Sequence, residues 1–212
     1  AGSRVVDFGA GVGAAGLALA RRVEGIDLVL VEIDGMLAEL ARSNAAANAI
    51  GADVIVLDVE SSAEAFAAAG LVPDSADVVL MNPPFNDGAR HRASPDSARA
   101  SAHVASEDTL VRWIHAARRI LKSGGALTLI WRAEGIADVL AALARGYGSL
   151  AIVPVHGEAG APAIRILVRA VKGGRAPTRI LPALMLNDES GLPNKEVQQI
   201  LAGGGVLPLA TL

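Results

Sequence analysis

The stretch RVVDFGAGVGAAG, residues 4–16, decides the fold of this chain. Arg4–Phe8 is a short apolar run typical of a buried strand, and a helix rich in Ala and Leu should follow it up to about Arg22. The glycines between them allow the backbone to turn sharply and to approach a ligand closely. The stretch therefore predicts a ligand site where the first strand meets the first helix.

Strands and helices continue to alternate along the chain. We expect strands at residues 4–8, 28–33, 54–57, 77–81, 126–131, 149–155 and 164–171, and helices at 37–48, 61–69, 109–121, 136–143 and 194–201. Continuous apolar strands that alternate with helices predict a parallel sheet with helices on both faces. The last two strands come close together, which suggests that the final strand is antiparallel. The prediction is an α/β, Rossmann-like fold with a seven-stranded, mostly parallel sheet.

The same pattern suggests how the chain is organised. Residues 1–181 should form one domain, and residues 182–212 should be a tail packed on it. Residues 86–106 are polar, basic and without apolar periodicity, so we expect a loop there. Because the first strand begins at residue 4 with nothing ahead of it, we also expect that an N-terminal segment is missing from this sequence.

Composition excludes several classes of function. The chain of 212 residues has no cysteine, which excludes a disulfide scaffold, a thiolate metal site and a Cys nucleophile. No apolar run reaches the roughly 18 residues of a membrane span, and no signal peptide is visible, so a cytoplasmic protein is expected. The net charge of −3 argues against a generic nucleic-acid binder, but residues 88–122 carry 7 basic and 3 acidic side chains. Positive charge therefore gathers in one stretch.

The glycine turn has two functional interpretations and a structural one. As Gly11-x-Gly13-x-x-Gly16, with Glu32 about the right distance further on, it matches the fingerprint of dinucleotide binding. As Asp-x-Gly-x-Gly-x-Gly over residues 7–13, it matches the turn that binds S-adenosylmethionine. The turn could also be a close-packed connection without a ligand.

Acidic residues at strand ends favour the methyl-donor interpretation. Asp7 would face the amino-acid part of S-adenosylmethionine, and Glu32 would accept hydrogen bonds from the ribose hydroxyls. Asp58 follows the third strand and could reach the adenine amino group, although an acid there could equally be a helix cap or a turn residue. Cofactor contacts are therefore predicted for Asp7, Gly9, Ala10, Gly11, Gly13, Glu32, Asp58 and Asn82.

A second motif, Asn82-Pro83-Pro84-Phe85, follows the fourth strand. Its two prolines fix a rigid turn at the carboxyl end of the sheet, where open α/β folds bind ligands. The Asn82 side chain and the Pro83 carbonyl could accept hydrogen bonds from a planar NH2 group and localise its lone pair for attack on a sulfonium methyl. Phe85 would stack on the base. We assign catalysis to these four residues, although a proline-rich strand end with Phe85 as a core plug would look similar.

Together these motifs resemble the class I S-adenosylmethionine-dependent methyltransferases that carry an Asn-Pro-Pro-Phe or Asn-Pro-Pro-Tyr signature. The resemblance is greatest to the bacterial family that methylates the exocyclic amino group of the adenine next to the anticodon of valine tRNA. It covers residues 4–171 through the motifs DFGAGVGAAGL, LVEID and MNPPF and the basic stretch 87–103. It implies that Asp7, Gly9, Gly11, Glu32 and Asp58 contact the cofactor, that Asn82 and Pro83 hold the amino group, and that Phe85 stacks on the base. This family also has an upstream segment that closes over the cofactor.

The basic stretch points to tRNA, or another RNA, as the partner. Arg90 and Arg92 lie just beyond Phe85, with His91 and Arg99 nearby, where cations would hold phosphates around the pocket. The alternative is a solvated loop whose arginines pair with surface acids. Arg112, Arg118, Arg119 and Lys122 are expected on the solvent face of a helix, and Trp113 and Trp131 in a core or an interface. No metal is expected, because no histidine stands at ligand spacing with another ligand.

Three rival functions remain open from the sequence. A protein glutamine methyltransferase also acts on a planar amide, although its motif usually resembles Asn-Pro-Pro-Tyr, so Phe85 and the basic stretch favour adenine in RNA. An NAD-dependent oxidoreductase would use the other interpretation of the glycines, but it gives Asn82-Pro83-Pro84-Phe85 no role. A non-catalytic RNA-binding domain of the same fold is the third rival.

Overall fold

The computed structural model describes residues 2–84, 95–207 and 209, with the backbone alone for residues 95–107. The strands are β1 (Arg4–Phe8), β2 (Asp27–Glu32), β3 (Asp53–Val56), β4 (Ala76–Met81), β5 (Leu121–Arg132), β6 (Tyr147–His156), β7 (Ala163–Lys172), β8 (Arg179–Ile180) and β9 (Leu184–Met185). The helices are α1 (Ala14–Arg22), α2 (Gly35–Ala47), α3 (Ala63–Ala68), α4 (Pro95–Ile120), α5 (Ile136–Leu143) and α6 (Lys195–Leu201), and a 3₁₀ helix spans Ala133–Gly135.

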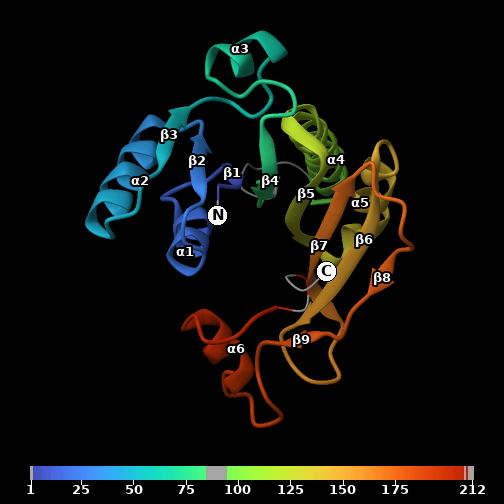
Figure 1. Ribbon diagram of the computed structural model, residues 1–212. Helices are drawn as coiled ribbons and strands as arrows, with labels where there is room; N and C mark the ends of the chain where they lie inside the picture. Colours follow the sequence, from blue (N-terminus) through green and yellow to red (C-terminus); the bar gives the residue numbers. More distant parts are fainter. Residues whose placement is uncertain (1, 85–94, 208, 210–212) are drawn as a thin grey trace.

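Within the described residues, these strands form a single sheet with the order β3-β2-β1-β4-β5-β7-β6-β8 (Figure 1). Strands β1 to β5 pair in parallel, and β7 is antiparallel to both β5 and β6. The predicted Rossmann-like sheet with an antiparallel last strand is therefore confirmed. The structure adds the two-residue strands β8 and β9, which both pair in parallel with β6.

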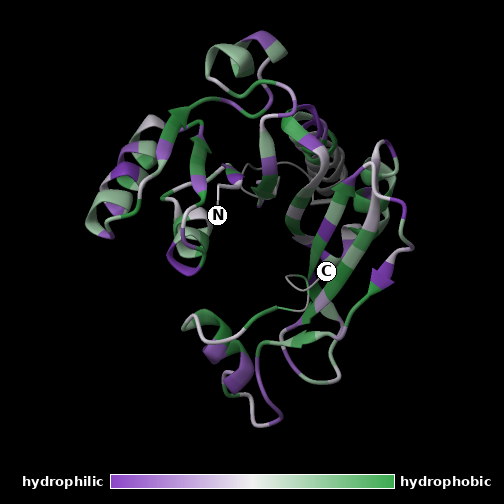
Figure 2. Ribbon diagram, viewed as in Figure 1, coloured by the Kyte–Doolittle hydropathy of each residue, from purple (hydrophilic) through white to green (hydrophobic). Residues whose placement is uncertain are grey.

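Alternate residues of each central strand face opposite helical layers. Val5, Leu28 and Leu30 pack with buried residues of α1 and α2, including Leu17 and Ala41. The intervening strand residues pack on the other face against α3, α4 and α5, in a cluster that includes Val6, Phe8, Val29, Val31, Phe66, Ile114 and Leu143. This period of two explains why the buried strands read as continuous apolar runs. Figure 2 shows β2 and β6 largely in the hydrophobic colour, whereas polar residues mark α2 and α6.

Side-chain caps begin three of the described helices: α2, α3 and also α6, where the Asn194 side chain accepts a hydrogen bond from the Glu196 amide at 2.9 Å. The Asp34 carboxylate accepts hydrogen bonds from the backbone amides of Met36 at 2.7 Å and Leu37 at 3.2 Å, at the start of α2. The Ser62 hydroxyl accepts one from the Ala65 amide at 3.4 Å, at the start of α3. Such caps satisfy amides that have no partner inside the helix. Ser62 is therefore the N-cap of α3.

The predicted loop over residues 86–106 is wrong for residues 95–106, because α4 begins at Pro95. Proline suits the first helical position, where its missing N–H needs no partner. Alanine is common in this stretch, and a helix that is already anchored by packing further along extends easily through such residues. Helix α4 also ends earlier than expected, at Ile120, and β5 begins at Leu121 rather than Ala126. None of the helices in the described ranges is both long and apolar enough to cross a membrane.

The C-terminal stretch lies along the outer strand β6 and returns toward α1 (Figure 1). Leu209 is buried and packs with Ala151 and Val153 of β6. The Arg22 guanidinium of α1 donates a hydrogen bond to the Ile200 carbonyl of α6 at 3.1 Å. These contacts hold the stretch against the sheet and against α1, while the division of the chain at residue 181 stays a prediction.

Candidate functional site

A pocket of about 220 Å³ opens where four neighbouring strands end at the carboxyl edge of the sheet. Its lining follows or ends each of β1, β2, β3 and β4, and α4 closes one side. The lining residues are Gly9, Glu32, Ile33, Leu57, Asp58, Val59, Asn82, Pro84 and Trp113. Five of the predicted site residues, Gly9, Glu32, Asp58, Asn82 and Pro84, therefore come together in one pocket. Ligands bind at this edge in open α/β sheets because the strand order reverses there.

Glu32 is fixed in place by backbone amides. Its side chain is only 6% exposed, and its two carboxylate oxygens accept hydrogen bonds from the Gly11 amide at 2.7 Å and the Asp34 amide at 3.0 Å. An ionised carboxylate has about four acceptor sites. Roughly two therefore remain for further donors, which fits a pair of ribose hydroxyls.

Asp7 lies behind the turn rather than in the lining of the pocket. It is 4% exposed, and its carboxylate accepts a hydrogen bond from the Gly16 amide of α1 at 2.9 Å. Burial raises the pKa of Asp7 to about 6, the hydrogen bond from Gly16 opposes that shift, and the negative charge of Glu32 adds to it. A buried acid with a raised pKa is typical of a functional site. Its contact with the cofactor stays a prediction.

The glycine turn adopts backbone conformations that other residues rarely tolerate. Gly9, Gly11 and Gly13 have φ angles of +65°, +56° and +84°. The turn is tied to its surroundings by the Gly13 amide, which donates to the Ala10 carbonyl at 2.8 Å, and by the Ala10 amide, which donates to the Val31 carbonyl at 3.0 Å. Ala10, Gly11 and Gly13 thus shape the turn without lining the pocket, and their cofactor contacts stay predictions.

Asp58 combines a structural and a potential binding role. Its carboxylate accepts a hydrogen bond from the Glu60 amide at 2.8 Å, as expected for a turn residue. It is also exposed and lines the pocket beside Leu57 and Val59. The structure therefore supports the turn interpretation and leaves the carboxylate accessible to a ligand.

The proline motif lies on the opposite side of the same pocket. Asn82 and Pro84 are exposed and line it, whereas Pro83 is buried. This alternation is what a rigid extended turn produces, because consecutive residues point to opposite sides. Phe85, Arg90 and Arg92 lie outside the described residues, so their predicted contacts with base and phosphate stay predictions.

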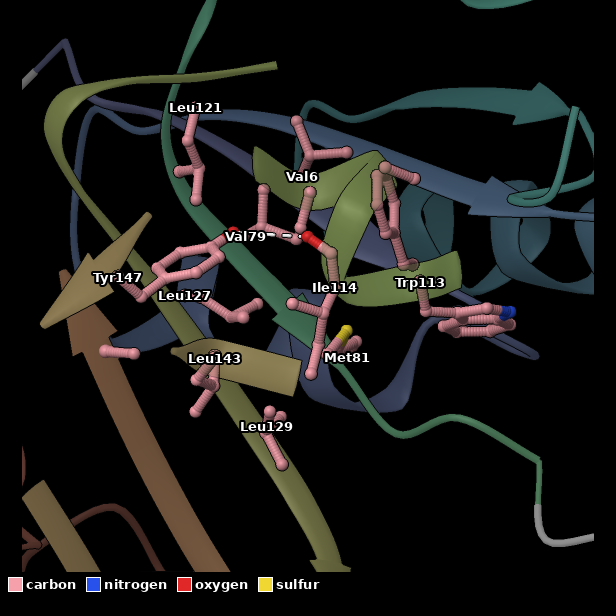
Figure 3. Close-up of a cluster of buried hydrophobic side chains, with 14 of the residues drawn as sticks. Val6, Val79, Met81, Trp113, Ile114, Leu121, Leu127, Leu129, Leu143 and Tyr147 are labelled. Carbon is pink, nitrogen blue, oxygen red and sulfur yellow. Dashed lines mark hydrogen bonds between the residues drawn. The ribbon is translucent and has the colours of Figure 1, made fainter. Parts of the chain in front are cut away.

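Trp113 was expected only in a core or an interface, but it also forms a wall of this pocket. The side chain is 7% exposed and meets Phe8 edge-on, with ring centroids 6.4 Å apart and planes at 88°. Figure 3 shows its indole at the margin of the cluster, pointing away from Leu127 and Leu143. One signal was present in the sequence: Trp113 lies on the helix that follows the proline motif. Its contact with the pocket depends on how α4 packs.

A family model described as "Methyltransferase small domain" matches residues 1–153. The chain belongs to the methyltransferase small domain family. S-adenosylmethionine is the cofactor of this family of methyltransferases, so the methyl-donor interpretation of the glycine turn is confirmed over the NAD interpretation.

Curated relatives of this methyltransferase domain carry names of RNA-modifying enzymes. The ribosomal RNA small subunit methyltransferase C of Stutzerimonas stutzeri is 34% identical over 106 residues, which are 49% of this chain and 29% of that protein. The tRNA1(Val) (adenine(37)-N6)-methyltransferase of Porphyromonas gingivalis is 30% identical over 137 residues, which are 63% of this chain and 51% of that protein. The matched region thus spans about half of the tRNA enzyme and less than a third of the ribosomal RNA enzyme.

A solved structure matches this methyltransferase domain over almost its whole length. The crystal structure of a predicted O-methyltransferase from Agrobacterium tumefaciens is 31% identical, with a TM-score of 0.80, and the match covers 97% of this chain and 91% of that one. The fold described above, including the β6–β7 hairpin, is therefore that of a class I methyltransferase.

The residues of this methyltransferase domain suit S-adenosylmethionine. Free acceptor sites on Glu32 match the ribose hydroxyls, and Ile33 and Val59 offer apolar surface for the adenine ring. The space beside Gly11 is open, since an added Cβ there would meet nothing within 4 Å. The residues present therefore fit the cofactor that the family implies.

Proposed function

We propose that this chain methylates the exocyclic amino nitrogen of adenine in tRNA. S-adenosylmethionine supplies an electrophilic methyl group on its sulfonium when it is bound. The observation that carries the proposal is that Asn82 and Pro84 line the same pocket as Gly9 and Glu32. The acceptor motif and the cofactor motif thus face one space, although they are far apart in the sequence.

The chain's own residues would position the acceptor rather than act as strong acids or bases. The Asn82 carboxamide oxygen and the Pro83 carbonyl would each accept a hydrogen bond from the amino group. This grip would pull the hydrogens out of the plane of the base and localise the nitrogen lone pair. Phe85 would stack on the exposed face of the base, and Arg90 and Arg92 would hold neighbouring phosphates. Pro84 would keep this turn rigid.

The names of the relatives support RNA as the acceptor and also raise a second candidate. Ribosomal RNA is favoured by the relative from Stutzerimonas stutzeri, which is named as a ribosomal RNA methyltransferase. The Agrobacterium protein is described as a predicted O-methyltransferase. An O-methyltransferase must help a hydroxyl to lose its proton, whereas the pair of acceptors at Asn82 and Pro83 suits a planar NH2 group. We therefore retain nitrogen as the acceptor atom.

The test is methyl transfer from labelled S-adenosylmethionine to three acceptors: undermodified tRNA, small-subunit ribosomal RNA, and a release-factor peptide with its target glutamine. A reaction without an acceptor is the blank. Nucleosides from the RNA reactions are then identified by mass spectrometry. We expect N6-methyladenosine in tRNA. Label in ribosomal RNA alone, in the peptide alone, or on a ribose oxygen would each overturn the tRNA proposal and name its replacement.

A further inference from the structure

A second hollow lies at the amino-terminal edge of the sheet, opposite the methyl-donor pocket. Its volume is about 470 Å³, and it lies between the last turns of α4 and the loops before β4 and β6 and after β7. A smaller hollow of about 160 Å³ between α4 and α5 shares His115 and Arg118 with it. Together they form a groove along the outer face of α4, which we name the α4 groove. Nothing described so far assigns it a function.

The α4 groove is lined by more cations than acids. Among the described residues that line the two hollows, Arg118, Arg119, Arg145 and Lys172 are basic and Asp74 is acidic. Lys172 is neutralised in part, because its ammonium lies 3.0 Å from the Asp74 carboxylate. The other three cations leave a net positive charge, which suits an anionic ligand.

Arg118 is held ready by its surroundings. Its guanidinium donates a hydrogen bond to the Arg145 carbonyl at 3.1 Å, and its side chain packs against Gly146, where an added Cβ would come 2.8 Å from Nη1. Within the part of the chain that the structure describes, no carboxylate lies within 4.0 Å of it. A guanidinium fixed in this way keeps donors for phosphate oxygens and loses little side-chain entropy on binding.

Arg119 adds positive charge to the groove, but contacts within the protein already hold its guanidinium. Its guanidinium lies 4.6 Å from the centroid of the Phe66 ring and donates a long hydrogen bond of 3.4 Å to the Ser61 carbonyl. The pKa of the exposed Glu64 carboxylate is lowered mainly by a hydrogen bond with Ser62, and the charge of Arg119 adds a smaller part of this shift. A substitution of Arg119 would therefore disturb packing, so it is a poor probe of binding.

We propose that the α4 groove binds backbone phosphates of the RNA substrate at a distance from the methylated base. This inference rests on the proposed RNA methylation. The same helix carries Trp113 in the methyl-donor pocket and Arg118 in the groove, five residues and about 8 Å apart along the helix axis. An RNA strand that leaves the pocket could reach the groove by passing over α4. A basic groove that follows the backbone is the usual way in which proteins hold single-stranded RNA.

The test replaces Arg118 and Arg145 with glutamine. The side chain of Arg145 is exposed, and its substitution leaves the backbone carbonyl that accepts a hydrogen bond from Arg118 in place. Binding of undermodified tRNA is measured by fluorescence anisotropy at several salt concentrations, together with S-adenosylmethionine affinity and thermal melting. We expect about tenfold weaker RNA binding at low salt and a salt slope reduced by about 1 to 2, with cofactor affinity unchanged. The matched control R21Q/K195Q removes the same charge from exposed positions on α1 and α6, and should bind RNA like the wild type.

Each alternative outcome gives a decision. If the wild type methylates tRNA but R118Q/R145Q binds it normally, the groove is not an RNA site and the proposed function stands. Equal weakening in the control variant would reduce the effect to overall charge and overturn the inference. Inorganic phosphate or pyrophosphate could raise the melting temperature of the wild type but not of R118Q/R145Q, while both proteins bind RNA equally well. That result would overturn the inference and assign the groove to a small anionic ligand. If the wild type neither binds nor methylates RNA, the proposed function fails, and this inference fails with it.

Discussion

The indole of Trp113 lies against the α-carbon of Gly9, so closely that a Cβ added to Gly9 would come 2.5 Å from its Cη2 atom. This contact joins the glycine turn after β1 to the helix after the proline motif. It explains why the turn needs glycine at this position apart from any ligand. Gly11 lacks such a neighbour: an added Cβ there would meet nothing within 4 Å.

The pair Gly9 and Gly11 separates crowding from backbone strain. Both have positive φ angles, +65° and +56°, so replacement by alanine strains the backbone at either position. Only Gly9→Ala also clashes with Trp113, and overpacking typically costs about 1–3 kcal/mol. We expect the unfolding free energy of Gly9→Ala to fall below that of Gly11→Ala by about that amount, measured in urea without cofactor. Equal stabilities would show that the indole simply moves aside.

The buried carboxylate of Asp7 should make the protein less stable as pH rises. Because its folded-state pKa is raised from 3.8 to about 6, the folded protein holds this proton to higher pH than the unfolded chain does. The contribution to stability is present below about pH 4 and is lost as pH rises through about 6. The loss at neutral pH is on the order of 3 kcal/mol.

Asp7→Asn tests this linkage, because an amide can keep the hydrogen bond from Gly16 and carries no charge. We expect Asn at this position to raise the melting temperature more at pH 7.5 than at pH 4.5. It should also weaken S-adenosylmethionine binding if Asp7 faces the cofactor as predicted. A gain in melting temperature that is the same at both pH values would contradict the raised pKa.

Glu32→Gln should loosen the glycine turn and weaken cofactor binding. A carboxylate accepts on both oxygens, whereas an amide accepts on one, so one of the Gly11 and Asp34 amides would face an NH2 group. Hydrogen bonds to charged groups contribute about 1.5–3 kcal/mol, so affinity should fall by roughly 10- to 100-fold. Calorimetric titration with S-adenosylmethionine measures it. Glu39→Gln, on the exposed face of α2, is the control and should leave affinity unchanged.

Asn82→Ala should abolish methyl transfer and reduce cofactor affinity only slightly, because the main role assigned to Asn82 is to hold the acceptor, and it is one of several predicted cofactor contacts. Methylation of tRNA and binding of S-adenosylmethionine are measured on the same preparation. Asn82 is exposed, so folding should not depend on it, and thermal melting checks this. A parallel loss of cofactor binding and methyl transfer would give Asn82 a structural role instead.

Arg90→Ala/Arg92→Ala should weaken tRNA binding in a salt-dependent way, because both arginines are predicted to contact phosphates beside the target base. The salt slope should fall by about 1 for each contact that is lost. Anisotropy with undermodified tRNA measures the effect. Unchanged affinity and slope would remove these two residues from the substrate site.

Local sequence determined the order of the elements and the positions of the site motifs. Apolar runs such as Arg4–Phe8 and the glycines after them fix a strand and a turn through backbone preferences that depend on few neighbours. Parallel strands end at one edge of the sheet, so residues that follow them, such as Glu32 and Asn82, could be placed near each other in advance. The Rossmann-like sheet and its antiparallel last strand followed from the same reasoning.

Tertiary structure alone decided the contacts that close and tune the pocket. No local pattern places the Trp113 indole on Gly9, buries Asp7 against the Gly16 amide, or brings Arg118 and Lys172 into one groove. The start of α4 at Pro95 was also missed, because a helix can continue through residues without apolar periodicity once packing anchors the rest of it. Burial, pKa and side-chain contact depend on residues brought together from distant parts of the chain, so they become defined only when the helices pack on the sheet.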